Sequence, residues 1–251
     1  MEDPLQKDLE ASTNSPQWFA TTHWSVVIQA GTPDSPRAVD ALEKLCRTYW
    51  LPLYGYIRRQ GYGPHDAQDL TQGFFARLLK VNSFAGVRRE KGKFRSFLLA
   101  ALNHFLSDER DHARAEKRGG GQIIIPIDEN DAEERYSQMG DLGPEPEKVF
   151  DRRWALTVLE EAMARLKKDY VASGRAELFE HLRPYLSVEA SPGEYDTLAQ
   201  KVGMSGNAFG VAVHRLRQRY RECIRLELGQ TVASPRELDE EMKYLFSVLS
   251  P

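Results

Sequence analysis

Four arginines alternate along one short segment, where guanidinium groups can bind phosphates or the edges of nucleic-acid bases. The segment GMSGNAFGVAVHRLRQRYRE covers residues 203–222 and contains Arg215, Arg217, Arg219 and Arg221. The whole chain of 251 residues carries a formal net charge of -3, so this positive charge is a local feature. The functional signal therefore lies in how charge is distributed along the chain.

The arginine-rich segment has the pattern of a helix-turn-helix. Leu198 and Ala199 give the first helix an apolar side, and residues 202–205 form a turn in which glycine tolerates a positive φ. Ser205 is placed to cap the second helix. With about 100° per residue, the buried face of the second helix is predicted to comprise Phe209, Val213, Leu216, Tyr220 and Cys223.

The opposite face of the second helix can enter a DNA major groove. This face comprises Asn207, Val211, His214 and Gln218, with Arg215 beside them. The small Ala208 and Gly210 permit close approach to DNA. Arg217 and Arg219 flank the apolar stripe and Arg221 lies near Arg217, which suits the phosphate walls of a groove. The alternative is a solvated basic helix in a bundle that neutralises acidic parts of the chain.

A second basic segment, residues 86–118, holds nine basic and five acidic side chains. The basic residues are Arg88, Arg89, Lys91, Lys93, Arg95, Arg110, Arg114, Lys117 and Arg118. The aromatic residues with them are Phe84, Phe94, Phe97 and Phe105. A charged track with aromatic rings suits unpaired bases. Four phenylalanines at near-helical spacing are more often part of a core, so the functional interpretation depends on the surrounding architecture.

Helical periodicity predominates in the elements that must position these residues, and almost no segment alternates as a strand does. The sequence predicts an all-α protein of two small helical domains. One long helix is expected from Ser35 to Gln60, which Pro52 would kink or divide. Further helices are expected at residues 65–80, 95–117, around 154–166, 178–186, from Pro192 to the turn at 202–205, 206–221 and 235–249.

Composition divides the chain into five parts. Residues 126–151 contain nine acidic side chains against two basic ones, with glycines and prolines, which is typical of a linker. The predicted parts are a disordered tail (1–17), a first helical domain (18–118), a flexible acidic linker (119–146), a helix-turn-helix domain (147–228) and a C-terminal helical extension (229–251).

The C-terminal extension has an apolar face on an acidic helix, formed by Leu238, Met242, Leu245, Phe246 and Leu249. We expect this face to pack back on either domain. Its acidic residues would then lie near basic surface and compete with DNA phosphate, which would make the extension a mild autoinhibitor. A simple packing extension of the second domain is the alternative, and both remain open.

Taken in order, these motifs resemble those of a bacterial RNA polymerase sigma factor of the extracytoplasmic-function (group 4) type. DAQDLTQGFFARLLK is similar to the family's clamp-binding helix, and FAGVRREKGKFRSFLLAALNHFLSDERDHARAEKR to its −10 loop and following helix. YDTLAQKVGMSGNAFGVAVHRLRQRYRE is similar to its −35 reader. The resemblance covers roughly residues 20–228, and WFATTHWSVV with the C-terminal extension suggests a distinct subgroup.

The resemblance implies three sets of site residues. RNA polymerase would be bound by Asp69, Gln72 and Phe75. The −10 region of the promoter would be bound by Arg88, Lys91, Lys93, Phe94, Arg95, Phe97, Asn103, His104 and Arg110. The −35 element would be bound by Ser205, Asn207, Ala208, Val211, His214, Arg215, Arg217, Gln218, Arg219 and Arg221.

Two positions depart from the family pattern. Phe97 stands where the family usually has tryptophan. His104 stands where an asparagine usually helps to line the pocket for a flipped base, and either Asn103 or His104 can take that function. The sequence therefore leaves the base-pocket residue open.

The resemblance implies a promoter-specificity subunit whose partners are promoter DNA and the clamp and flap of core RNA polymerase. An anti-sigma factor or another regulator is a further partner that it allows. The alternative is a stand-alone helix-turn-helix regulator, which would usually dimerise on a palindrome. An enzyme is disfavoured, because the six histidines have no ligand spacing and nucleotide-binding and hydrolase motifs are missing.

No metal or cofactor is expected. Cys46 and Cys223 lie in helical patterns and are predicted to be core residues in a reducing compartment. The polar, acidic N-terminus is unlike a signal peptide, and no apolar run approaches the ~20 residues of a membrane span. We therefore expect a cytoplasmic bacterial protein.

Overall fold

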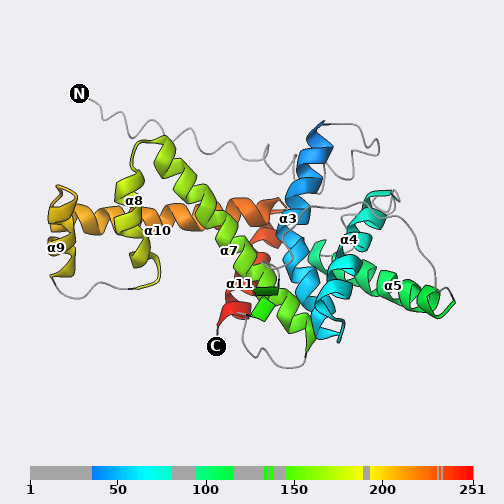
Figure 1. The fold of residues 1–251 in the computed structure, drawn as a ribbon. Coiled ribbons are helices and arrows are strands. Elements are labelled where there is room, and N and C mark those ends of the chain that lie inside the picture. Colours follow the sequence, from blue (N-terminus) through cyan, green and yellow to red (C-terminus); the bar gives the residue numbers. More distant parts are fainter. Residues whose placement is uncertain are drawn as a thin grey trace. The chain divides into compact units, whose positions relative to one another are not determined.

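The computed structural model describes residues 36–80, 94–115, 133–134, 136–137, 145–188, 193–230, 232 and 234–250. Within these residues the fold is all-α, with eight α-helices and no strand, which confirms the predicted all-α class (Figure 1). The elements are α3 (Pro36–Arg59), α4 (Pro64–Lys80), α5 (Phe94–Ala115), α7 (Pro146–Ala172), α8 (Ala176–Leu182), the 3-10 helix η4 (Arg183–Leu186), α9 (Glu194–Lys201), α10 (Gly206–Gly229) and α11 (Pro235–Leu249).

The chain forms two compact units. The first comprises Met1–Trp154 together with Gly229–Pro251, and the second comprises Ala155–Leu228. The second unit is thus an insertion in the first, and the chain passes between them inside α7 and again inside α10. The boundaries differ from those expected from composition, because apolar side chains from the start of α7 and from α11 are buried in the first unit.

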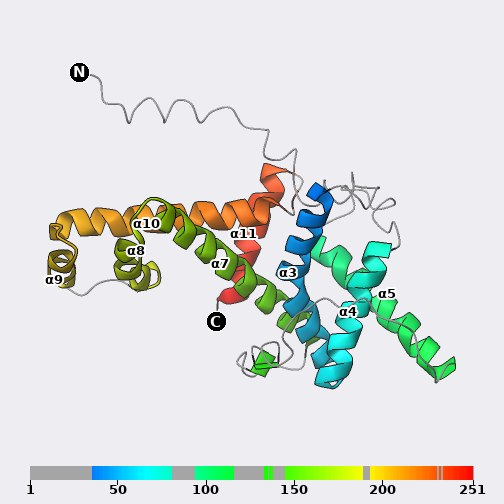
Figure 2. The ribbon, with the colours of Figure 1, turned by 45° about the horizontal axis from the view of Figure 1, so that its top comes forward.

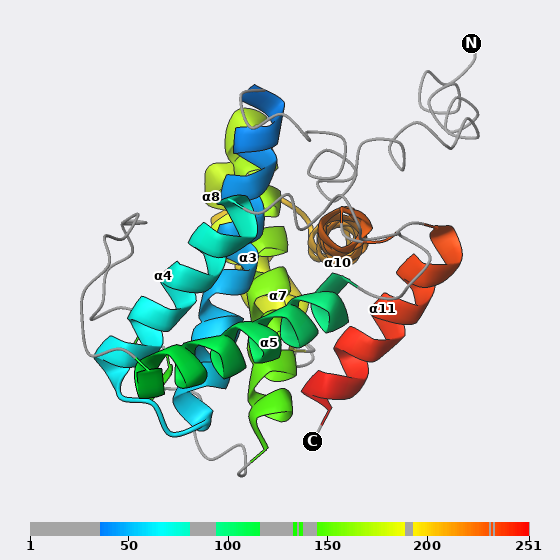
Figure 3. The ribbon, with the colours of Figure 1, turned by 90° about the vertical axis from the view of Figure 1, so that its right-hand side faces the viewer.

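In the first unit, α3 packs against α4, and α4 packs against α5 (Figure 3). Pro52 lies inside α3, which remains one helix and is not divided. The core between these helices consists of large apolar side chains, among them Leu53, Ile57, Phe74, Leu98, Leu102 and Leu106. Burial of this kind of side chain contributes about 1.5–3 kcal/mol for each residue, which is enough to hold the three helices together.

The helix α11 belongs to the first unit. Ser234 caps it by accepting a hydrogen bond from the Glu237 N–H at 3.2 Å, and a proline follows at the first helical position. Leu238, Met242 and Leu245 are buried as predicted, whereas Phe246 is about half exposed at 47%. The C-terminal extension therefore packs on the first unit, the outcome that the sequence left open.

In the second unit, α7, α8, η4, α9 and α10 surround an aromatic core. The rings of Tyr185, Tyr195 and Phe209 contact one another, with centroids 5.5 to 6.1 Å apart. Phe179 and Leu216 complete the centre of this unit, both essentially without solvent exposure. The core fixes α9 against the first turns of α10, which is the geometry that a helix-turn-helix needs (Figure 2).

Candidate nucleic-acid interface

The turn between α9 and α10 is tight and capped. Gly203 has φ of +67°, a left-handed conformation that glycine adopts without strain. The Met204 N–H donates to the Ala199 carbonyl at 2.8 Å, which closes the turn. Ser205 Oγ accepts from the Ala208 N–H at 3.2 Å and so caps α10, as the sequence predicts. Local chemistry thus determines where α10 begins.

The buried face of α10 agrees with the predicted one. Phe209, Val213, Leu216 and Cys223 are essentially inaccessible to solvent. Tyr220 is half-buried, and its hydroxyl donates to the Leu159 carbonyl on α7 at 3.1 Å. Burial raises the pKa of Tyr220 to about 12. The helix is therefore anchored along its whole length in the second unit.

The opposite face of α10 is open to solvent. Its exposed side chains are Asn207, Val211, His214, Arg215, Gln218 and Arg221. Val211 is 43% exposed, so this face also presents an apolar side chain. Arg215 and Arg221 have no hydrogen-bond or ion-pair partner among the residues that the structure describes. This face therefore offers a ligand exposed side chains and unpaired hydrogen-bond donors.

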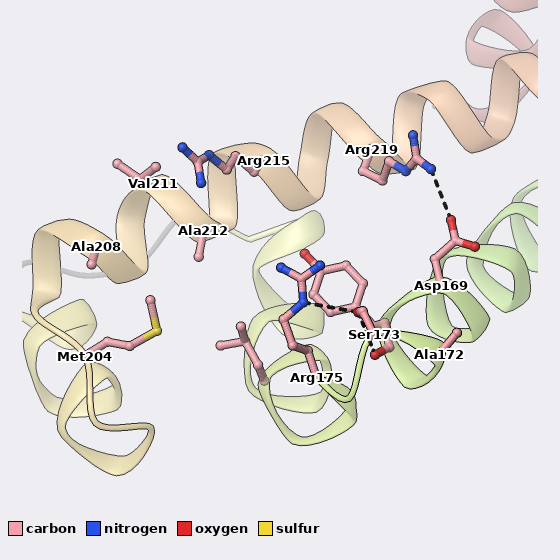
Figure 4. Close-up of a pocket in the computed structure, with 12 residues that line it drawn as sticks. Asp169, Ala172, Ser173, Arg175, Met204, Ala208, Val211, Ala212, Arg215 and Arg219 are labelled. Carbon is pink, nitrogen blue, oxygen red and sulfur yellow. Dashed lines mark hydrogen bonds and ion pairs between the residues drawn. The ribbon is translucent and has the colours of Figure 1, made fainter. Parts of the chain in front are cut away.

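A groove of about 910 Å³ adjoins the exposed face of α10 (Figure 4). One wall comes from α10 and carries Ala208, Val211 and Arg215. The other wall comes from the end of α7 and the start of α8, and it includes Arg175. The small residues leave room in the groove, and the arginines make it cationic, so the groove suits an anionic ligand.

The four arginines of α10 have different roles. Arg217 donates to the carbonyls of Tyr185 at 2.9 Å and Val188 at 3.0 Å, at the end of η4. Arg219 pairs with Glu222 at 2.9 Å and with Asp169 at 3.4 Å. The predicted phosphate contact does not fit Arg217, whose donors already satisfy backbone carbonyls. Of the four, Arg215 and Arg221 are the cations without a partner among the described residues, whereas Arg219 is exposed but ion-paired.

Arg175 is a candidate that the sequence interpretation missed. It lies directly before α8. Its Nε donates to Ser173 Oγ at 3.1 Å, and its guanidinium lies 5.3 Å from the centre of the Tyr170 ring. Neither contact neutralises its charge. The signal was a lone arginine at a predicted helix start, outside the helix-turn-helix motif, which becomes meaningful once the groove is seen.

On the first unit, three predicted −10 residues, Arg88, Lys91 and Lys93, lie outside the described residues. Phe94 is 4% exposed, and its ring packs edge-on against Tyr49 with centroids 5.2 Å apart. Arg95 is 9% exposed and ion-paired. The burial of Phe94 and Arg95 does not fit the direct DNA contact predicted for them, because both side chains are used in the packing of the unit.

The remaining −10 residues lie along α5, where Phe97 is half-buried and Asn103, His104 and Arg110 are exposed. Asn103 accepts hydrogen bonds from the Tyr56 hydroxyl at 3.0 Å and from Gln60 at 3.4 Å. His104 has no such contact among the residues that the structure describes. Of the two alternatives for the base pocket, His104 is thus the side chain that can reorient.

Two further residues join this surface without having been predicted. Arg110 donates to the Tyr62 hydroxyl at 2.9 Å and to the Gln60 side chain at 2.8 Å. Gln60 therefore links Asn103 and Arg110 across the turn between α3 and α4. Periodicity could not find this link, because it joins helices that are distant in sequence.

The predicted polymerase-binding residues differ in accessibility. Asp69 is half-buried and pairs with the exposed His65 at 3.2 Å. Gln72 is 8% exposed and Phe75 is 2% exposed. The expectation that Gln72 is free to meet a partner is wrong for this structure, because α4 packs on α3 and α5 and so has a wide buried face. Asp69 is the member of the set that a partner can reach.

Part of the predicted linker packs on α3. Glu133 accepts from Arg58 Nη2 at 2.7 Å and Nε at 3.0 Å, and the Tyr54 hydroxyl also donates to it. The Arg58 guanidinium lies 5.1 Å from the centre of the Tyr136 ring. Hydrogen bonding from Arg58 lowers the pKa of Glu133. This part of the acidic segment therefore has a specific docking site on the first unit.

Comparison with known proteins finds no matching family model, no matching curated protein and no matching solved structure. Within the described residues, no group of histidine, cysteine or acidic side chains has the arrangement of a metal site. The described helices also include none with the length and apolar character that spanning a membrane requires.

Proposed function

We propose that this chain is a promoter-specificity subunit of the sigma type, which binds core RNA polymerase and directs it to −35 and −10 elements. The observation that carries the proposal is the exposed face of α10, where Arg215 lies unpaired beside a cationic groove. The sequence resemblance supplies the promoter elements and the polymerase clamp and flap as the partners.

Duplex DNA fits this face for a physical reason. A major groove is wide enough to admit a helix, and its base edges accept hydrogen bonds from arginine. Arg215 would contact base edges, with Asn207 and His214 on the same exposed face. Arg175 approaches from a second element and would hold the phosphate backbone, which positions the helix without reading sequence.

The first unit would act at the −10 element through the exposed side chains of α5. His104 and Arg110 supply an exposed ring and an exposed cation on the same helix. An unstacked base needs a flat group and nearby positive charge. Separating that base from its neighbours costs a few kcal/mol, which contacts of this kind would offset.

The alternative is a stand-alone helix-turn-helix regulator. Such a protein would use the same face of α10 and would usually bind a palindrome as a dimer. It would have no need for a polymerase contact on α4. Binding to purified core RNA polymerase therefore distinguishes the two functions.

The test is gel filtration of the purified chain with bacterial core RNA polymerase. We expect co-elution, and we expect Asp69→Ala to weaken it. Asp66→Ala is the matched control, because Asp66 is an exposed acid in the first turn of the same helix. Failure of the wild-type chain to co-elute, together with dimer formation on a palindromic duplex, would favour the regulator.

A second experiment tests the DNA contact. Duplexes are selected by the wild-type chain from a randomised pool, and binding to selected and scrambled duplexes is then compared. Arg215→Ala should reduce that discrimination by about 1–3 kcal/mol. The control Arg183→Ala removes an exposed arginine of η4 that pairs with Glu180 and should leave discrimination unchanged. Equal effects of the two variants on discrimination would show that Arg215 does not contact base edges.

A further inference from the structure

One basic residue of the first unit is enclosed by the C-terminal helix. Arg95 Nε lies 3.2 Å from Glu241 Oε2 of α11, and Arg95 Nη1 lies 2.9 Å from Asp151 Oδ1 of α7. The Tyr244 hydroxyl of α11 donates to the other oxygen of Asp151 at 2.6 Å. The three helices α5, α7 and α11 therefore meet in one polar cluster within the first unit.

Aromatic rings cover the same guanidinium. Arg95 lies 3.8 Å from the centre of the Tyr244 ring and 5.2 Å from the centre of the Trp154 ring. Contacts of a guanidinium with such rings are attractive, and more so when water is excluded. Arg95 thus has its hydrogen-bonding edge on carboxylates and its flat surface on rings, with no side left for a nucleic-acid phosphate.

One guanidinium faces two carboxylates in this cluster, and all three groups are largely buried. The Glu241 side chain is 4% exposed and that of Arg95 is 10% exposed. Burial by itself would lower the pKa of Arg95, but the carboxylates of Glu241 and Asp151 outweigh it and raise that pKa. Loss of Arg95 would leave both buried carboxylates without this cation, whereas loss of Glu241 would leave Arg95 with Asp151 alone.

The apolar face of α11 packs beside this ion pair. Leu238, Met242 and Leu245 are buried in the first unit. A buried ion pair gives little net stability compared with apolar residues of the same volume. Glu241 therefore serves a different purpose from adhesion: it places α11 at one position, over Arg95.

We propose that α11 is a C-terminal latch in which Glu241 occupies Arg95 in place of a nucleic-acid phosphate. The latch rests on the proposed function, since it regulates the DNA-binding surface of the first unit. With α11 docked, Arg95 is enclosed. With α11 released, Arg95 keeps one carboxylate, Asp151, and becomes accessible at the start of α5, the helix that carries His104 and Arg110.

Release of α11 also changes how the chain is attached to the first unit. The chain enters the second unit through α7 and returns to the first through α10. α11 begins at Pro235, a few residues after α10 ends at Gly229. Docking of α11 is thus what attaches the chain to the first unit again after α10. The contacts of α11 are non-covalent, so its release would expose Arg95 without breaking a bond of the chain.

The test uses two full-length variants, Glu241→Gln and Glu240→Gln. Both remove one negative charge from α11, so any general effect of charge on nucleic-acid binding is the same. Glu240 is exposed and pairs with Arg236 on its own helix, whereas Glu241 is buried against Arg95. The probe is a fluorescent single-stranded oligonucleotide of mixed sequence, and binding is measured by anisotropy.

We expect Glu241→Gln to bind the probe about tenfold more tightly than the wild-type chain and Glu240→Gln to bind like the wild type. Adding Arg95→Gln to Glu241→Gln should remove the gain. Amide hydrogen exchange across residues 235–249 should be faster in Glu241→Gln, and phenylglyoxal should modify Arg95 more readily, which shows release of α11 with the rest of the chain folded.

Equal binding by the two glutamine variants would overturn the latch, as would a gain that survives the loss of Arg95. An Arg95 that becomes reactive without any gain in binding would also overturn it, because α11 would then cover the residue without regulating it. Co-elution with core RNA polymerase is measured separately through α4. If the chain co-elutes with polymerase but the binding results contradict the latch, the proposed function stands and the latch is wrong.

Discussion

Arg217→Ala should destabilise the second unit and leave DNA binding almost unchanged. The guanidinium of Arg217 donates to the carbonyls of Tyr185 and Val188 at 2.9 and 3.0 Å. A hydrogen bond from a charged group contributes about 1.5–3 kcal/mol. The Val188 carbonyl is at an exposed position where water can replace the donor, so the loss comes mainly from Tyr185. We therefore expect the free energy of local opening, in which the end of η4 separates from α10, to decrease by about 1–2 kcal/mol.

Native-state hydrogen exchange of peptides from η4 and α10 measures this opening directly. Arg215→Ala is the matched control, because Arg215 is two residues away and has no partner among the described residues. The control should leave exchange unchanged and reduce the discrimination between selected and scrambled duplexes by about 1–3 kcal/mol. Unchanged exchange together with a reduced salt slope of DNA binding in Arg217→Ala would refute the reasoning, because that result would assign Arg217 to a phosphate.

Three further predictions concern the second unit. Gly203→Ala should destabilise the turn by about 1–2 kcal/mol through its positive φ, whereas Gly210→Ala, in ordinary contact with Tyr195, should not; hydrogen exchange of α9 and α10 decides. Burial raises the pKa of Tyr220 to about 12 from 10.0, so the unfolded chain ionises first, and the free energy of unfolding should fall as pH rises from 10 to 12, less so in Tyr220→Phe. Burial also raises the pKa of the Cys223 thiol, so a thiol reagent near neutral pH should modify the half-buried Cys46 first, as peptide mass spectrometry would show.

Helical periodicity was sufficient for the architecture of α10. Its buried face depends on residues a few positions apart in one helix, and Phe209, Val213 and Leu216 lie where the pattern predicts. The same pattern could not separate Arg217 from Arg215. Their difference depends on the Tyr185 carbonyl, which lies 32 positions earlier in the chain. Charge spacing along a helix identifies cations, while tertiary contacts decide which of them remain available.

The helix α4 shows a second limit of periodicity. An apolar stripe predicts one buried face, and polar residues outside it are then expected to be accessible. Gln72 is buried nevertheless, because α4 contacts α3 and α5 and needs more than one face. The number of helices that surround α4 depends on the whole fold and cannot be predicted from its own pattern. Of the residues predicted to bind polymerase, Asp69 alone is therefore accessible.

In the C-terminal helix, a buried charge determines the docking position, which the apolar face alone does not determine. Leu238, Met242 and Leu245 could pack on many apolar surfaces, which is why the sequence left the position of α11 open. A buried carboxylate is costly wherever it has no cationic partner. Glu241 therefore excludes the positions at which it would be unpaired and selects the one beside Arg95. The residue that makes docking specific is also the residue that makes it sensitive to a competing anion, and this links the packing of α11 to the binding of nucleic acid.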